Sequence, residues 1–132
     1  MSGKIVLASC AVTFAVALAG AASAQVPIAN HYLCHKAGDQ KVPAKFVQQI
    51  GVSVVDQTIA TTGDAKKPFL LCNPVSKNGG PIVDAALHYC CYKFKSASKV
   101  KASYDITDQF GPLRLETKKP FLLCNPCSKA PA

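Results

Sequence analysis

Residues 66–77 read KKPFLLCNPVSK and residues 118–129 read KKPFLLCNPCSK, so one segment of twelve residues occurs twice in the chain. The two copies differ at a single position, Val75 against Cys127, and a match of this length is far beyond chance. Self-similarity at such a spacing is typical of a repeated supersecondary unit. The chain is therefore an internal duplication, and its fold depends on how one unit packs against the other.

The duplication extends toward the front of each copy, where HYLCHK at 31–36 corresponds to HYCCYK at 88–93. The offset between the copies is 57 residues at the front and 52 at the back, so the first copy contains five additional residues. We place repeat one at 31–77 and repeat two at 88–129. The linker between them, 78–87, begins with Asn-Gly-Gly-Pro, which is typical of a turn.

Both repeats have the residue patterns of β-strands. Between Val100 and Thr107 apolar and polar residues alternate with period two, as in a half-buried strand, and Leu113 and Leu115 indicate another. The HYLCHK and HYCCYK segments are rich in aromatic residues, which also suits strands. The FLLC segments at 69–72 and 121–124 are continuously apolar, which predicts strands buried on both faces.

A unit of about 45 residues rarely forms a core of its own. We therefore predict a single all-β domain, a small disulfide-stapled sandwich or barrel in which two pseudo-symmetric repeats pack together. We expect a pseudo-twofold axis to relate the repeats. The alternative is two separately stapled lobes.

Residues 1–24 contain the three parts of a signal peptide. Lys4 provides a basic start, Ile5–Leu18 is an uncharged apolar run, and Ala22-Ser23-Ala24 is a small-residue cleavage site. We predict cleavage after Ala24, a secreted or periplasmic mature chain at 25–132, and no transmembrane span after cleavage. Two alternatives remain: an uncleaved membrane helix, for which the run is short, and lipidation of Cys10, whose LASC context resembles a lipobox but precedes most of the apolar run.

Six cysteines follow the predicted cleavage site, and an even number in a short exported chain indicates a disulfide framework. Equivalent positions in the repeats predict one bridge in each. Two further cysteines of repeat two stand where repeat one has Leu33 and Val75. We therefore expect Leu33 to contact Val75, and the two cysteines to form a third bridge, nested with the second. The predicted bridges are Cys34–Cys72, Cys91–Cys124 and Cys90–Cys127. The alternatives are that the last pair stays free or bonds between molecules, and a strained vicinal bridge between Cys90 and Cys91.

The HYLC and HYCC segments, DQFG at 108–111, and LCNP at 71–74 and 123–126 together resemble a known family. This is the repeated "HYxCYK … DQFG … KPxxLCNP" domain of exported bacterial proteins, a domain of unknown function. The resemblance covers nearly all of the mature chain. His35 stands in place of the Tyr in the pattern, Thr58-Ile59 in place of Phe-Gly, and Cys90 and Cys127 are additional. The resemblance implies an exported module and no established activity.

Residues with catalytic or metal-binding chemistry are few. His31, Cys34 and His35, and the Cys124-x2-Cys127 pair, have spacings of metal ligands, but disulfide formation competes for the thiols. Two carboxylate pairs, Asp56 with Asp108 and Asp64 with Glu116, follow from the duplication alone, and aspartates beside turns are common. We predict no catalytic, cofactor-binding or metal-binding residues and a protein that is not an enzyme. An exported enzyme with an unrecognised site is the alternative.

The chain is basic, with a net charge of +8 that comes almost entirely from lysine. Lysine suits loose electrostatic attraction more than bidentate recognition. A Lys-Lys pair precedes the FLL segment in both repeats. The plainer interpretation is that these lysines protect an apolar strand against aggregation. The functional hypothesis is that these residues contact an anionic partner: Lys66, Lys67, Lys118 and Lys119.

We therefore expect a structural or binding module of the cell envelope or extracellular space. Its partner would be an anionic envelope polymer or protein, or further copies of itself. A nucleic-acid partner is not expected, because no basic stripe with interleaved aromatic residues is present. A cationic protein that acts on membranes is a further alternative.

Overall fold

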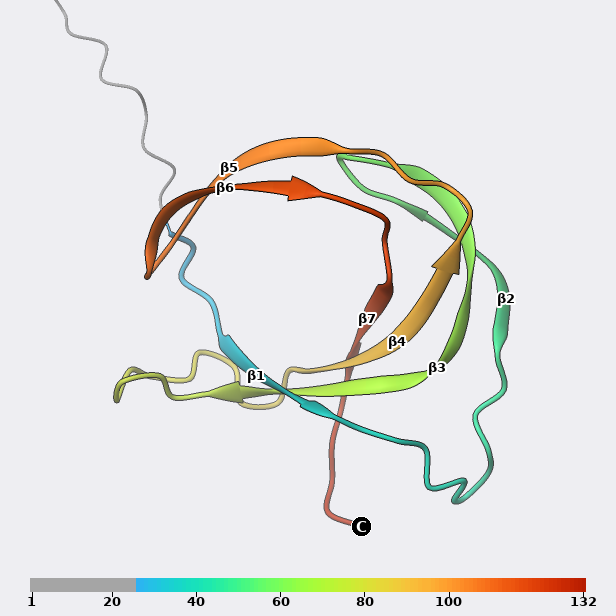
Figure 1. Cartoon of the computed structure of the whole chain (residues 1–132). Coiled ribbons are helices and arrows are strands. Elements are labelled where there is room, and N and C mark those ends of the chain that lie inside the picture. Colours follow the sequence, from blue (N-terminus) through green and yellow to red (C-terminus); the bar gives the residue numbers. More distant parts are fainter. Residues whose placement is uncertain (1–25) are drawn as a thin grey trace, which may run out of the picture.

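The computed structural model describes residues 26–132, and Figure 1 shows that they form an all-β domain. The predicted signal peptide and Cys10 lie outside the described residues. No helix long and apolar enough to cross a membrane occurs within 26–132. The seven strands are β1 (His31–Lys36), β2 (Gln49–Val55), β3 (Ala60–Val75), β4 (His88–Ser96), β5 (Ala102–Asp108), β6 (Gly111–Thr117) and β7 (Leu122–Cys127).

Repeat one contributes three strands and repeat two contributes four, because β3 corresponds to β6 and β7 together. In repeat one β1 pairs antiparallel with the C-terminal half of β3, and β2 pairs with its N-terminal half. In repeat two β4 pairs with β7, while β5 and β6 form a separate two-stranded sheet. The predicted strand segments are thus present, and the linker 78–87 lies between β3 and β4.

The two repeats join by antiparallel pairing of β3 with β4, which gives the order β1-β3-β4-β7 in one sheet. Because every neighbouring pair in this order is antiparallel, β1 and β4 run in the same direction. The repeats are therefore displaced by two strands across the sheet, and the expected pseudo-twofold relation is wrong. The outer edges of β1 and β7 carry no further strand among residues 26–132, so the sheet is not a closed barrel.

The core is small and lies where β3 meets β4. Ala65, opposite Phe94 on β4, is buried, and so is Phe94. The ring of Phe94 lies so close to Gly63 that a Cβ atom there would be 2.6 Å from its Cζ and 2.6 Å from the Lys95 carbonyl oxygen. Beside them Thr61 and Ser96 share a buried hydroxyl–hydroxyl hydrogen bond of 2.6 Å. Glycine at 63 is therefore required by the close approach of the two strands.

The three disulfides bond the pairs that the repeat symmetry predicts. Cys34–Cys72 joins β1 to β3, and Cys91–Cys124 joins β4 to β7, each with a Cα–Cα distance of 3.9 Å between directly opposite residues. Cys90–Cys127 links the same strands diagonally, with Cα atoms 6.0 Å apart. Their counterparts in repeat one, Leu33 and Val75, both line one hollow.

The expectation that both FLLC segments are buried on both faces is met only in part by the first copy and is wrong for the second. In β3 Leu70 and Leu71 lie between two neighbouring strands and are half-buried. In repeat two the segment enters the edge strand β7 at Leu122, and Phe121 just before it is 67% exposed. The duplication reproduces the segment, but β7 has a neighbouring strand on one side only among residues 26–132, whereas β3 has one on each side.

Candidate anionic-partner site

The β1–β2 connection, 37–48, is longer than its counterpart 97–101 between β4 and β5, so it accommodates the additional residues of repeat one. The carboxylate of Asp39 holds this loop: Oδ1 accepts a hydrogen bond from the Lys41 N–H at 2.8 Å and Oδ2 one from the Phe46 N–H at 2.7 Å. These two N–H groups, Phe46 first, hold the pKa of Asp39 below its ordinary value. The carboxylate therefore stays charged and fixes the loop over most of the pH range.

The loop and the middle of β3 enclose a hollow of about 380 Å³. Four lysines from the two segments surround it, and we call it the lysine hollow. Its apolar floor is formed by Phe46, Pro68 and Phe69. The floor continues onto β4, where Tyr92 lies 5.0 Å from the Phe46 ring and the Lys93 ammonium lies 4.8 Å above the Phe69 ring. The lysines are Lys41, Lys45, Lys66 and Lys67.

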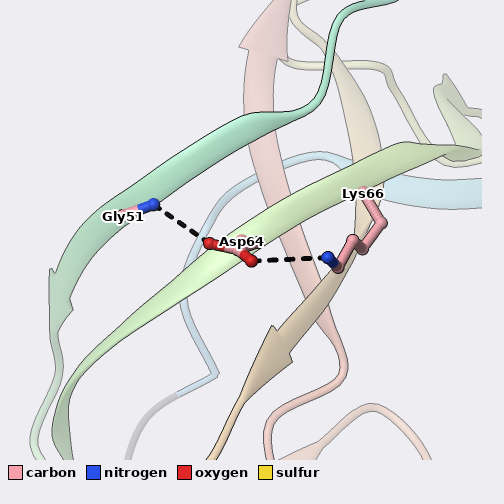
Figure 2. Close-up of polar contacts among 3 residues, drawn as sticks. All are labelled: Gly51, Asp64 and Lys66. Carbon is pink, nitrogen blue, oxygen red and sulfur yellow. Dashed lines mark hydrogen bonds and ion pairs between the residues drawn. The ribbon is translucent and has the colours of Figure 1, made fainter.

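One of these lysines is neutralised by a neighbour, as Figure 2 shows. The Lys66 ammonium lies 3.3 Å from Oδ2 of Asp64, whose Oδ1 accepts a hydrogen bond of 3.0 Å from the Gly51 N–H. The Gly51 N–H and then the Lys66 side chain hold the pKa of Asp64 below its ordinary value. Gly51 has a φ of 69° and sits at a register shift between β2 and β3. Glycine tolerates this left-handed conformation, which turns its N–H toward the carboxylate.

The remaining lysines of the hollow have no carboxylate partner within ion-pair distance among residues 26–132, where the ion pairs are Lys66–Asp64 and Arg114–Asp105. Asp39 also lines the hollow, and its single negative charge offsets only part of the positive charge of the four lysines there. Lys41, Lys45 and Lys67 are exposed to solvent. The hollow therefore presents an excess of positive charge above an apolar floor.

The second predicted lysine pair lies elsewhere. Lys118 and Lys119 line a smaller hollow of about 230 Å³ together with Asp56 and Thr117. The aspartate places a negative charge on this site. The structure thus brings Lys66 and Lys67 together with two loop lysines but does not gather the two predicted pairs into one site.

The paired carboxylates form no shared site. Oδ1 of Asp56 accepts the N–H groups of Thr58 and Ile59, and Oδ1 of Asp108 accepts the N–H of Phe110. Both aspartates therefore stabilise the turns that follow them. The cysteines with metal-ligand spacing are all in disulfides, and residues 26–132 contain no group of three metal-ligating side chains.

A second, more apolar cavity of about 480 Å³ lies between β2, the Phe94 side chain and the start of β7. Val54, Ile59, Phe94 and Leu122 line it, and Asp56 is its only charged residue. That aspartate is already used by its turn. The cavity therefore offers apolar surface without a set of convergent polar groups.

Comparison with known proteins adds no relative: no family model matches the chain, and no curated protein or solved structure is significantly similar to it. The resemblance seen in its motifs accordingly stays a prediction. Sequence reasoning missed Lys41 and Lys45. The signal that pointed to them was the excess of five residues in repeat one, which falls in the connection that carries both.

Proposed function

We propose that the protein is an exported, non-catalytic module that binds an anionic polymer of the cell envelope or extracellular space and assembles with further copies of itself. The observation that supports binding is the lysine hollow. Two segments distant in sequence bring four lysines together, and three of them are free of carboxylate partners among the described residues.

The chemistry of the hollow suits a polymer with repeated negative charges. Exposed ammonium groups attract anions over about 10 Å at moderate salt and impose little geometry. Such attraction is individually weak and gains strength from several charges held together. Because Asp39 fixes the loop backbone before a partner arrives, binding orders the lysine side chains but not the backbone that carries Lys41 and Lys45.

Binding to dextran sulfate, a soluble polyanion, tests this proposal. We expect the triple variant Lys41→Gln/Lys45→Gln/Lys67→Gln to lose about tenfold or more in affinity, since each exposed charge contributes up to about 1 kcal/mol. The matched control, Lys99→Gln/Lys101→Gln/Lys129→Gln, removes the same charge outside the hollow. An equal loss in both variants would show that only net charge matters and would reject the hollow as the site.

The location rests on the disulfides and on the predicted signal peptide. Three bridges in one small domain indicate folding in an oxidising compartment. We propose that cleavage after Ala24 delivers the chain to the periplasm or the exterior. Intact mass before and after reduction checks this: the expected protein starts at Gln25 and gains six hydrogens on reduction. Free thiols or lipid on Cys10 would contradict it.

A further inference from the structure

We infer that copies of this chain assemble head to tail, with the outer edge of β7 of one copy pairing with the outer edge of β1 of the next. The inference deepens the self-assembly part of the proposed function by naming the strands, their order and their register. It does not depend on the lysine hollow, so either can fail without the other.

The pairing of the two repeats inside one chain provides the pattern for the proposed contact between copies. There β3, the last strand of repeat one, pairs with β4, the first strand of repeat two. Among residues 26–132 no strand pairs with the outer edge of β7, the last strand of repeat two, or with the outer edge of β1, the first strand of repeat one. Because PFLLCNP at 68–74 recurs unchanged at 120–126, the free edge of β7 reproduces the side of β3 that already binds a first strand.

The two free edges also present their backbone groups outward in the right places. Ala37 donates its N–H to the Phe69 carbonyl oxygen, so in the β1–β3 ladder the bonded pairs alternate away from Cys34 and Cys72. Their Cα distance of 3.9 Å agrees with a pair that exchanges no backbone bonds. The N–H and C=O of Cys34, and of Tyr32 two residues earlier, therefore point to the outer edge of β1.

The same argument holds for β7. Phe94 donates its N–H to the Phe121 carbonyl oxygen, which makes Leu122 and Cys124 the residues whose backbone groups point away from β4. The Cys91–Cys124 Cα distance of 3.9 Å again agrees. Leu122 and Cys124 are the counterparts of Leu70 and Cys72, which are the residues of β3 that face β4.

The internal junction fixes the register of the proposed contact. Within the chain Leu70 lies opposite Cys91, Leu71 opposite Cys90, and Cys72 opposite Tyr89. Replacing each residue by its repeat counterpart gives the pairs between copies. They are Leu122 with Cys34, Leu123 with Leu33, and Cys124 with Tyr32 of the next copy.

Side chains beside the backbone fit this pairing. At the internal junction Asn73 Oδ1 lies 3.3 Å from His88 Nδ1, and Tyr89 packs edge-on against Tyr32 at 5.0 Å. Asn125 and His31, the counterparts of the first pair, stand on the two free edges. Pro126 ends the contact as Pro74 does inside the chain, since its outward position lacks an N–H.

The contact is heterologous, because the surface given by β7 differs from the surface given by β1. Each added copy leaves one β1 edge and one β7 edge free, so growth continues until a ring closes or a filament forms. All copies are strongly basic, and salt screens their repulsion. Assembly should therefore strengthen as salt rises, whereas polyanion binding should weaken.

Residue-resolved amide hydrogen exchange of the disulfide-bonded chain tests the inference, at protein concentrations from about 10 μM to about 1 mM with and without added salt. We expect the N–H groups of Leu122, Cys124, Tyr32 and Cys34 to gain at least about tenfold protection with concentration. The neighbouring amides of Leu123 and Leu33 are bonded inside the fold and serve as internal controls. Unprotected edges throughout, or protection of β1 alone or β7 alone as in a twofold dimer, would overturn it.

A cross-linking experiment checks the register independently. Within one chain β1 and β7 are separated by two strands, so residues 33 and 123 cannot bridge intramolecularly. A mixture of the Leu33→Cys and Leu123→Cys variants, oxidised at the higher concentration, should give mixed dimers. Each variant oxidised alone is the matched control. Dimers that form as readily from Leu33→Cys alone would indicate β1–β1 pairing and reject the head-to-tail order.

Discussion

The KKPFLL segment has two different structures in one molecule. In repeat one it lies inside β3, a single strand of 16 residues that runs from the hairpin with β2 to the end of the sheet. In repeat two the corresponding run is broken between β6 and β7. The difference lies in the neighbours, because β4 pairs with Gly63, Asp64 and Ala65, while β6 pairs with β5 alone. Identical local sequence therefore gives one strand or two, depending on whether a further strand lies alongside.

The residues just before the segment agree with this explanation. Gly63 in repeat one allows β4 to approach, whereas its counterpart in repeat two is Leu115, which is 47% exposed. Among residues 26–132, β6 pairs with β5 and with no other strand. Its hairpin instead arches over the main sheet in Figure 1, and the ring of Phe110 at its tip lies 4.6 Å from the Lys77 ammonium.

The largest expected effect concerns the disulfides: the bridge that both repeats share should stabilise the fold more than the bridge that only repeat two has. Cys91 is almost completely buried, and its bridge joins directly opposite residues of β4 and β7. We expect Cys91→Ala/Cys124→Ala to lose about 2–5 kcal/mol of unfolding free energy, measured by urea denaturation. The bridge unique to repeat two should matter less, because Cys90→Leu/Cys127→Val restores the residues of repeat one and adds apolar surface. A larger loss from this second variant would contradict the ranking.

Exchange of Gly63 and Leu115 is the second test of the comparison. Gly63→Leu places a side chain where a Cβ alone would lie 2.6 Å from backbone oxygen and the Phe94 ring. Overpacking of this kind costs about 1–3 kcal/mol or more, and β3 should separate from β4. Leu115→Gly acts on an exposed strand position and should cost about 1 kcal/mol or less. Thermal unfolding of the two variants measures both effects. Equal losses would show that the close approach at Gly63 does not decide how the hairpin packs.

The sequence predicts the strand content and the partners of the cysteines because both depend on local patterns and on the repeat equivalence. It does not predict the order of the strands. Equivalence alone permits β3 and β4 to meet side by side or face to face, and the close approach of Gly63 to Phe94 in the observed side-by-side pairing has no signature in the repeats. Two of the four lysines of the lysine hollow were predicted from the sequence. Lys66 and Lys67 stand in a repeated motif, whereas Lys41 and Lys45 occur in a loop without a counterpart and become part of the site only through Asp39.

Acid should destabilise repeat one more than repeat two, although this difference is smaller than the two above. Asp39 and Asp64, both in repeat one, have a lowered pKa because backbone N–H groups donate to their carboxylates. The unfolded chain therefore binds protons at higher pH than the folded chain does. The stabilisation is fully present above the ordinary aspartate pKa of about 3.9 and is lost as the pH falls through the lowered value. Loop 37–48 and β2 should loosen first, ahead of the β5–β6 hairpin.

Amide exchange of Gly51 as a function of pH measures this effect directly. Its N–H donates to Asp64 and to no strand partner in the register, so its protection should follow the charge of that carboxylate. Asp64→Asn keeps an oxygen acceptor but cannot titrate, and it should remove the acid dependence while lowering protection at neutral pH. Glu116→Gln changes the repeat counterpart, whose carboxylate has no hydrogen-bond partner among residues 26–132, and should leave Gly51 unchanged. If Gly51 loses protection equally in acid with Asn at 64, the acid sensitivity of repeat one comes from the loop at Asp39 rather than from the β2 register shift.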